Sequence, residues 1–233
     1  MTSRIAFALD YESFDEADRG LAAVRDEIGM AKVGLELFTR EGPRTVSLGA
    51  KHGLPVFLDL KLHDIPETVE RAVRSLRDSG ARFLTVHASG GAKMLERAVA
   101  AADGALSICA VTVLTSLSED DLSRIGLAGP SPERAVALAS LAYETGVRAF
   151  VCSPREVGLM RNALGPEATL ITPGIRSANA PPDDQKRTAT PFDAIHGGAD
   201  WIVVGRPIRD AVDPRAAAHS FRNEAARGFA QRS

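Results

Sequence analysis

The sequence predicts a single α/β domain in which eight parallel strands alternate with helices and close into a (β/α)8 barrel. Short apolar runs alternate with longer amphipathic stretches along the whole chain. Several of the runs are almost continuously apolar, which is typical of parallel strands that are covered on both faces. The length of 233 residues is within the range of one such barrel. We therefore expect residues 1–233 to form one domain, without a linker or an internal repeat.

Eight apolar runs are the candidate strands. They cover residues 5–9, 31–34, 55–61, 83–88, 107–114, 149–153, 169–174 and 201–206. An open, doubly wound sheet is the structural alternative, and it usually carries a glycine-rich fingerprint after its first strand. Here the first run ends in ALDYES, which contains no glycine. The pattern therefore favours the closed barrel, a TIM barrel.

Amphipathic stretches between the runs predict helices. The clearest examples cover residues 13–28, 66–79, 91–101, 132–145 and 154–164. Pro66, Pro132 and Pro154 stand where proline suits the first turn of a helix. Three glycines follow predicted helices as caps, namely Gly80, Gly146 and Gly165. The acidic pair in SLSEDDLS is typical of a capped helix start on the surface.

One long irregular segment covers residues 174–191, between the last two strands. A connection of this length is often a functional lid. We therefore predict that it closes over a site at one end of the barrel.

Composition excludes several classes of protein. The formal net charge of −2 provides no strong basic field to hold nucleic acid. No run approaches the roughly 18 apolar residues of a membrane span, and the start of the chain lacks the apolar segment of a signal peptide. Cys109 and Cys152 lie inside apolar runs and are expected to be buried, reduced thiols. Reduced thiols are typical of a cytoplasmic protein, which we expect here. No HExxH, CxxC or paired-histidine pattern occurs, so we expect no metal ion.

The most informative segment is VFLDLKLHDIPET, residues 56–68. Side chains alternate along a strand, so Asp59 and Lys61 should share one face while the intervening leucines occupy the other. Active sites of parallel barrels lie at the C-terminal ends of the strands, which places this pair at the rim and Asp64 in the following loop. An exposed strand with alternating charges is the alternative. It would not need a leucine at every other position.

Two further charges fit the same rim. Asp10 follows the first run, and Lys32 lies inside the second, between alanine and valine. A lysine in an apolar strand is rarely buried unless it is paired, and Asp10 and Asp59 flank it in barrel order. Taken alone, Lys32 is equally well explained as a structural ion pair. Together with Lys61, these residues form an alternating array of lysines and carboxylates that is poor for stability and suited to chemistry.

With these residues in place, the run DLKLHDIPET resembles the signature of the orotidine 5′-phosphate decarboxylase family. The similarity extends over essentially the whole chain. It implies a carboxy-lyase on a (β/α)8 barrel that makes uridine 5′-phosphate (UMP) in de novo pyrimidine biosynthesis. It also implies that the reaction uses no cofactor.

The resemblance assigns roles to the charged rim. The opening ALD is similar to the family segment whose aspartate, Asp10, contacts the substrate. The segment KVG similarly implies that Lys32 contacts the ribose. Lys61 is implied to be the proton donor, with Asp59 as its catalytic neighbour.

The resemblance also implies a homodimer with shared sites. Asp64 would enter the active site of the partner subunit, together with contacts from Ile65 and Thr68. His87 lies at the end of the fourth run, where a polar side chain could enter the site. We favour a structural or interface role for it.

The remaining implied contacts lie on the pyrimidine and phosphate sides. VTVLTS implies that Thr115 binds near the pyrimidine, and TPGIR, DDQKR and VVGRPI resemble the lid and phosphate segments. The residues implied there are Pro173, Arg176, Gln185, Gly205 and Arg206. Barrels commonly bind phosphate after the eighth strand, through backbone N–H groups and a helix N-terminus.

Two other functions stay open at this point. One is a metal-dependent sugar-phosphate decarboxylase or aldolase on a related barrel with the same DxKxxD strand. The IPET, LTS and DDQKR segments favour the nucleotide instead. The other is a non-catalytic nucleotide-binding barrel. The intact set of Lys32, Asp59, Lys61 and Asp64 argues against it, because a pure binder does not need such closely spaced buried charges.

Overall fold

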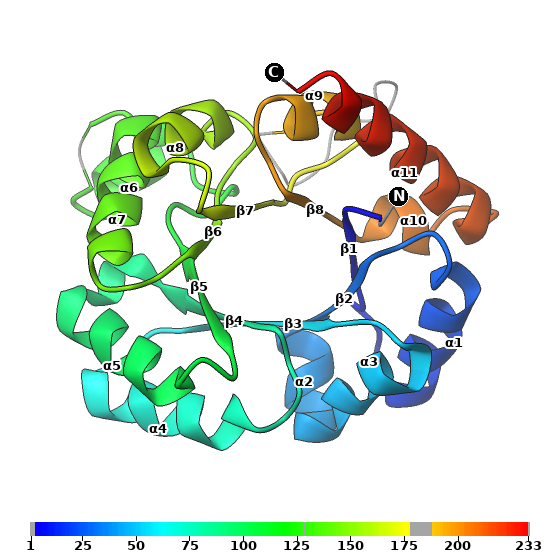
Figure 1. Cartoon of the computed structure of the whole chain (residues 1–233), viewed down its shortest axis with the longest axis horizontal. Coiled ribbons are helices and arrows are strands. Elements are labelled where there is room, and N and C mark those ends of the chain that lie inside the picture. Colours follow the sequence, from blue (N-terminus) through cyan, green and yellow to red (C-terminus); the bar gives the residue numbers. More distant parts are fainter. Residues whose placement is uncertain (1–2, 128, 178–187, 233) are drawn as a thin grey trace.

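The strands form a closed parallel barrel, as predicted, in a computed structural model that describes residues 3–127, 129–177 and 188–232. The order of strands around the barrel follows the chain, and β8 pairs with β1 to close it. Figure 1 shows the strands as an inner ring and the helices around them. The strands are β1 Ile5–Ala8, β2 Met30–Gly34, β3 Val56–Leu62, β4 Phe83–His87, β5 Ser107–Val111, β6 Ala149–Val151, β7 Thr169–Thr172 and β8 Trp201–Val204.

The outer ring consists of α-helices and two short 3-10 turns. The helices are α1 Phe14–Val24, α2 Leu35–Glu41, α3 Ser47–His52, α4 Pro66–Arg77, α5 Ala92–Ala102, α6 Glu119–Arg124, α7 Ser131–Glu144, α8 Val157–Leu164, α9 Pro191–His196, α10 Arg206–Arg209 and α11 Pro214–Ala230. The 3-10 turns are η1 Gly42–Val46 and η2 Ala88–Gly90. None of these helices, within the described residues, is long and apolar enough to cross a membrane.

Several of the predicted helix ends are confirmed, but the first helix ends at Val24 instead of residue 28, and the C-cap of α4 is Asp78 instead of Gly80. Pro66 opens α4, Gly165 caps α8, and the capping box at the start of α6 joins Ser118 to Asp121. The prediction for Pro154 is wrong, because it lies in a turn and α8 begins three residues later, at Val157.

Two apolar layers separate the inside of the barrel from the helices. The interior layer is formed by Ala6, Met30, Phe57, Phe83, Cys109, Ala149 and Ile171. The alternate residues, such as Phe7, Leu58 and Leu84, point outward and pack under the helices. This alternation confirms the predicted faces of β3, in which Asp59 shares the inner side with Phe57. Both cysteines are free and buried, and burial raises the pKa of Cys152 to about 12, so the thiol stays protonated.

Several strands end earlier than their apolar runs. The fifth ends at Val111 instead of residue 114, and the eighth ends at Val204 because Arg206 begins α10. Asp10 lies two residues beyond the end of β1. The runs continue past the strands because the following residues are also buried, as Val113 is at 5% exposure. Apolar content therefore reports burial here and not hydrogen bonding to a neighbouring strand.

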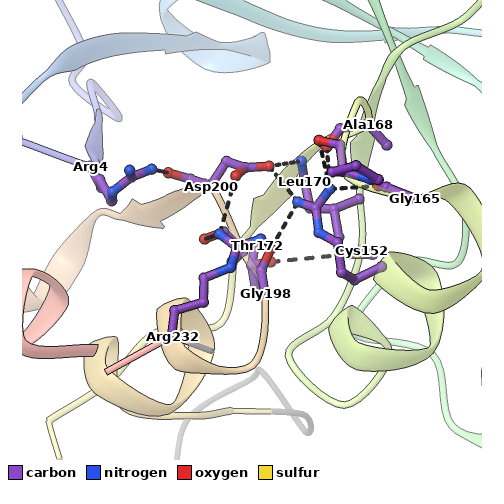
Figure 2. A network of polar contacts seen from close by, with 12 residues as sticks. Arg4, Cys152, Gly165, Ala168, Leu170, Thr172, Gly198, Asp200 and Arg232 are labelled. Atoms are coloured by element: carbon purple, nitrogen blue, oxygen red, sulfur yellow. Dashed lines mark hydrogen bonds and ion pairs between the residues drawn. The ribbon is translucent and has the colours of Figure 1, made fainter. Parts of the chain in front are cut away.

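A polar network lies at the N-terminal end of β7 and β8 (Figure 2). The carboxylate of Asp200, just before β8, accepts hydrogen bonds from Arg161 at 2.6 Å and from the Leu170 N–H at 2.9 Å. It also pairs with Arg232 at 3.3 Å. Arg161 continues to backbone carbonyls, among them that of Gly198. These bonds connect the start of β8 to β7, α8 and Arg232 near the C-terminus.

The predicted lid segment is described only at its two ends. Ile175 and Ala189 form a parallel bridge, and the Arg176 N–H donates to the Ala189 carbonyl at 3.0 Å. The segment therefore leaves and returns to the barrel at one point. Gln185 lies outside the described residues.

Candidate active site

A cavity of about 220 Å³ opens at the C-terminal end of the barrel. It brings together nine of the residues predicted for the site, namely Asp10, Lys32, Asp59, Lys61, Thr115, Pro173, Arg176, Gly205 and Arg206. Apolar side chains complete the wall, namely Ala8, Phe57, Val111, Val113, Leu114, Val151 and Val203. The sequence pattern did not single out these apolar residues, since they look the same as core residues.

The charged residues form an alternating array across the first three strands. The Lys32 ammonium lies 3.2 Å from Asp10 Oδ1 and 3.8 Å from Asp59 Oδ2. The Lys61 ammonium lies 2.7 Å from Asp59 Oδ1. Strand pairing sets these positions, because Lys32 stands opposite Ala8 of β1 and Asp59 stands opposite Gly34 of β2. The predicted order of charges around the rim is therefore present.

Because the array is largely buried, its charges interact strongly with one another. The side chains of Lys32 and Asp59 are 9% and 15% exposed. Burial by itself would raise the pKa of the Asp59 carboxyl. The charges of Lys32 and Lys61, and the hydrogen bonds from Lys61 and Thr85, outweigh that effect and hold the pKa below its ordinary value. Asp59 is therefore ionised at neutral pH and keeps both ammonium groups fixed in place.

Thr85 is the polar contact that sequence reasoning missed. It is fully buried in β4, and its hydroxyl contacts both the Lys61 backbone and the Asp59 carboxylate. The available signal was a threonine in the middle of the apolar run FLTVHA. A polar side chain at such a position needs a partner when it is buried.

Asp64, Ile65 and Thr68 do not line the cavity of their own chain. All three are exposed, and the Asp64 carboxylate accepts a hydrogen bond from the Ile65 N–H at 2.6 Å. Ile65 is 67% exposed, which is unusual for so large an apolar side chain. All three therefore lie at the surface, in the loop and the first helical turn after β3.

The wall that adjoins Asp10 combines glycine and arginine residues after β7 and β8. Gly205 leaves room there, since a Cβ atom at this position would lie 3.2 Å from the Ala8 Cβ and 3.4 Å from Asp10 Oδ2. Arg206 follows at the start of α10, and Arg176 stands at the base of the predicted lid. Arg209, at the other end of α10, donates to the Asp10 carbonyl at 2.6 Å. A cationic wall is thus connected to the charged array.

His87 lies at the end of β4, outside the cavity lining. Its ring centroid is 5.3 Å from that of His63. Burial, followed by the nearby charges of His63 and Lys61, lowers the pKa of His87, so it is neutral at neutral pH. Nothing in these contacts gives it a role in catalysis. Within the described residues, no group of three or more His, Cys, Asp or Glu side chains could hold a metal ion.

Gly34 leaves space for the charged array. A Cβ atom there would lie 2.8 Å from the Lys32 ammonium and 3.3 Å from Asp10 Oδ1. Its backbone, with φ −95° and ψ −178°, is open to alanine. We therefore expect Gly34→Ala to fold normally, to displace Lys32 from Asp10 and to lower kcat/KM about 10-fold or more. Steady-state kinetics of the purified variant measure this.

Gly158→Ala is the matched control. Gly158 lies in α8, and a Cβ atom there would meet only the Gly197 carbonyl, at 3.9 Å. We expect unchanged kinetics and a gain of about 0.5–1 kcal/mol in the free energy of unfolding. Unchanged kinetics in both variants would show that the position of Lys32 does not matter for turnover.

The fold and the cavity together define a class of protein. Ionised carboxylates and lysines alternate at the floor of a closed parallel barrel, and an arginine- and glycine-bearing wall follows the last strands. This arrangement is typical of a barrel enzyme that binds a phosphorylated substrate and acts through fixed charges.

Comparison with known proteins identifies the family to which the chain belongs. Residues 3–221 match the model of the Orotidine 5′-phosphate decarboxylase / HUMPS family, and the chain belongs to this family. It is 53% identical to the orotidine 5′-phosphate decarboxylase of Anaeromyxobacter sp. (strain K), over 94% of this chain and 97% of that protein. It is 50% identical to the orotidine 5′-phosphate decarboxylase of Thermobifida fusca, over 96% of each chain.

A solved structure agrees with the sequence relatives. The crystal structure of orotidine 5′-phosphate decarboxylase from Lactobacillus acidophilus superposes with a TM-score of 0.82 and 34% sequence identity. The superposition covers 96% of this chain and 99% of that one. The predicted family and the predicted barrel are therefore confirmed.

Proposed function

We propose that this chain converts orotidine 5′-phosphate to UMP with fixed charges alone, and that Lys61 protonates the product carbanion. The activity as such follows from the family and from relatives at about 50% identity. The observation that supports the role of the residues is the array of Asp10, Lys32, Asp59 and Lys61 inside the cavity.

The chemistry explains why a lysine is needed. Loss of carbon dioxide from C6 leaves a carbanion in the plane of the pyrimidine ring, where the π system cannot delocalise it. An ammonium group about 3 Å from that charge stabilises it by roughly 5–6 kcal/mol at an effective dielectric constant near 20. This corresponds to about four powers of ten in rate. The same ammonium group then delivers the proton to C6.

The carboxylates hold this ammonium in position. Asp59 binds Lys61 at 2.7 Å and also faces Lys32, which fixes the direction in which Lys61 can reach. Asp59, and Asp64 from a partner subunit, would also crowd the substrate carboxylate and raise the energy of the ground state. We assign the larger effect to orientation of Lys61, since the contacts of Asp59 support it directly.

The remainder of the rate enhancement comes from binding energy away from C6. The wall after β7 and β8 presents Arg176, Gly205 and Arg206, which suit a phosphate group. Segment 174–191 then acts as a lid, because its two described ends meet beside this wall. Closure would exclude water and bring Gln185 to the phosphate.

The active form is proposed to be a homodimer in which Asp64 acts in the neighbouring site. The exposed side chain of Ile65 and the position of Asp64 outside the cavity of its own chain support this arrangement. Mixing inactive Lys61→Ala with inactive Asp64→Ala subunits should restore activity, because one of the two hybrid sites receives both intact residues. Random exchange of equal amounts of the two subunits makes about half of the dimers hybrids, each with one active site of two, so about a quarter of wild-type activity is expected.

The control is each variant mixed with itself under the same exchange conditions. Mass spectrometry of intact dimers shows whether hybrids have formed. Hybrid dimers without recovered activity would show that Asp64 does not act in trans.

A direct assay tests the function. Purified protein is mixed with orotidine 5′-phosphate, the loss of its absorbance is followed, and the product is identified as UMP by chromatography. Stoichiometric UMP is the expected result. Absence of turnover by folded protein would refute the proposal.

A further inference from the structure

Thr85 faces a bulge in β3 at the catalytic pair. Leu58 pairs with Leu84 and Leu62 pairs with Val86, so the register between β3 and β4 shifts in this interval. Residues 59–61 of β3 therefore stand opposite the single residue Thr85. Because a bulge interrupts the regular hydrogen bonds between strands, other groups must satisfy the backbone there.

The backbone of Lys61 is in the left-handed region, with φ +50°. Side chains with a Cβ atom rarely adopt this conformation. Asp103 is the other non-glycine residue with positive φ in the described part of the chain, and it is the C-cap of α5, where such conformations are common. Lys61 lies inside a strand, so its surroundings must hold it in this conformation.

The hydroxyl of Thr85 makes both contacts that are needed. It accepts a hydrogen bond from the Lys61 N–H at 2.7 Å and donates one to Asp59 Oδ1 at 3.1 Å. The same Oδ1 accepts a hydrogen bond from the Lys61 ammonium at 2.7 Å. A hydroxyl has one hydrogen, so acceptance from the N–H leaves that hydrogen for the carboxylate. These hydrogen bonds therefore connect the Lys61 N–H, through the Thr85 hydroxyl and the Asp59 carboxylate, to the Lys61 ammonium group.

We propose that Thr85 is a positioning residue for the decarboxylation, whose hydroxyl holds Lys61 in its left-handed conformation and fixes the Asp59 carboxylate that aims the ammonium at C6. This proposal rests on the proposed function. Thr85 does not line the cavity, so it acts through Lys61 and Asp59 and not on the substrate.

Threonine combines two properties at this site. Its β-branched side chain is stiff at χ1 and suits a buried strand, and its hydroxyl supplies one donor and two acceptor sites. Valine has nearly the same shape without the hydroxyl. Serine keeps the hydroxyl and loses only a methyl group. The two substitutions therefore separate the hydrogen bonds from the packing.

The test compares Thr85→Val, Thr85→Ser and wild type in steady-state decarboxylation of orotidine 5′-phosphate. We expect Thr85→Val to lower kcat about 10- to 100-fold, since a small displacement of a catalytic group has an effect of this size. KM and the Kd for UMP should change less than about three-fold, because the phosphate wall is untouched. Thr85→Ser should retain kcat within about three-fold of wild type.

Thr172→Val is the control for the loss of a buried hydroxyl. Thr172 is fully buried in β7, and its hydroxyl lies near the Cys152 sulfur, at 4.0 Å, away from the cavity lining. It should keep wild-type kcat and KM. A comparable fall in Tm for Thr85→Val and Thr172→Val, with kcat lost only in the first, supports the positioning role.

Two results would overturn the proposal. One is Thr85→Val with kcat within about two-fold of wild type, and the other is an equal loss of kcat in Thr85→Val and Thr85→Ser. If the valine variant does not fold, Thr85→Ala against Thr85→Ser gives the same comparison, and equal kcat values again refute the role. Wild-type turnover in the same assay tests the proposed function separately.

Discussion

Lys61→Ala is expected to lose decarboxylation by about four powers of ten or more, because in the proposed mechanism Lys61 supplies the charge that stabilises the C6 carbanion and the proton that quenches it. Its affinity for UMP should change little, since the product carries no charge at C6. Its fold should persist, because the Lys61 side chain is 29% exposed and contributes to no apolar layer. Single-turnover kinetics and calorimetric titration of UMP measure the two quantities.

Lys93→Ala is the matched control, since Lys93 is an exposed lysine on α5 outside the cavity. It should keep wild-type kinetics. A folded Lys61→Ala protein that retains more than about a tenth of wild-type turnover, a loss below 1.4 kcal/mol, would show that Lys61 is not the proton donor.

Removal of the phosphate from the substrate is expected to have the second large effect. Orotidine should lose several powers of ten in kcat/KM, because in the proposed mechanism phosphate binding helps to close the lid and is expressed at the reacting carbon. Phosphite dianion can fill the vacant position beside Gly205 and Arg206, so it should restore part of the loss. Arg206→Ala should weaken this rescue, because the pocket then lacks a fixed cation. Kinetics of orotidine with increasing phosphite measure all three effects.

Arg25→Ala provides the comparison for arginine loss. Arg25 follows α1, outside the cavity, and its side chain is 54% exposed. Phosphite rescue in this variant should equal that of wild type. If the phosphate were only an anchor, phosphite would compete or have no effect, and Arg206→Ala would raise KM with kcat unchanged.

The barrel and the charged floor could be predicted because both follow from short-range patterns. Continuous apolar runs with intervening helices predict parallel strands, and the alternation of side chains predicts the shared face of Asp59 and Lys61. The rule that sites lie at the C-terminal strand ends then brings Asp10 and Lys32 to the same rim. Pairing of Lys32 with both carboxylates confirms this reasoning.

The remaining features depend on backbone geometry that no periodicity encodes. The left-handed conformation of Lys61 arises from a shift of register against β4, and the pattern of β3 alone contains no sign of it. The requirement for Gly34 likewise depends on where the Lys32 ammonium comes to rest. The role proposed for Asp64 rests on the family resemblance, because Asp64 lies outside the cavity of its own chain.

We propose that fixed side-chain charges, without a metal ion, carry the decarboxylation. The most direct measurement is turnover of orotidine 5′-phosphate by wild-type protein after exhaustive dialysis against a chelator, with and without added Mg²⁺. We expect kcat to be the same before dialysis, after dialysis and after Mg²⁺ addition. Loss of kcat on chelation that is restored by Mg²⁺ would contradict it and would favour the metal-dependent chemistry of the alternative barrel enzymes.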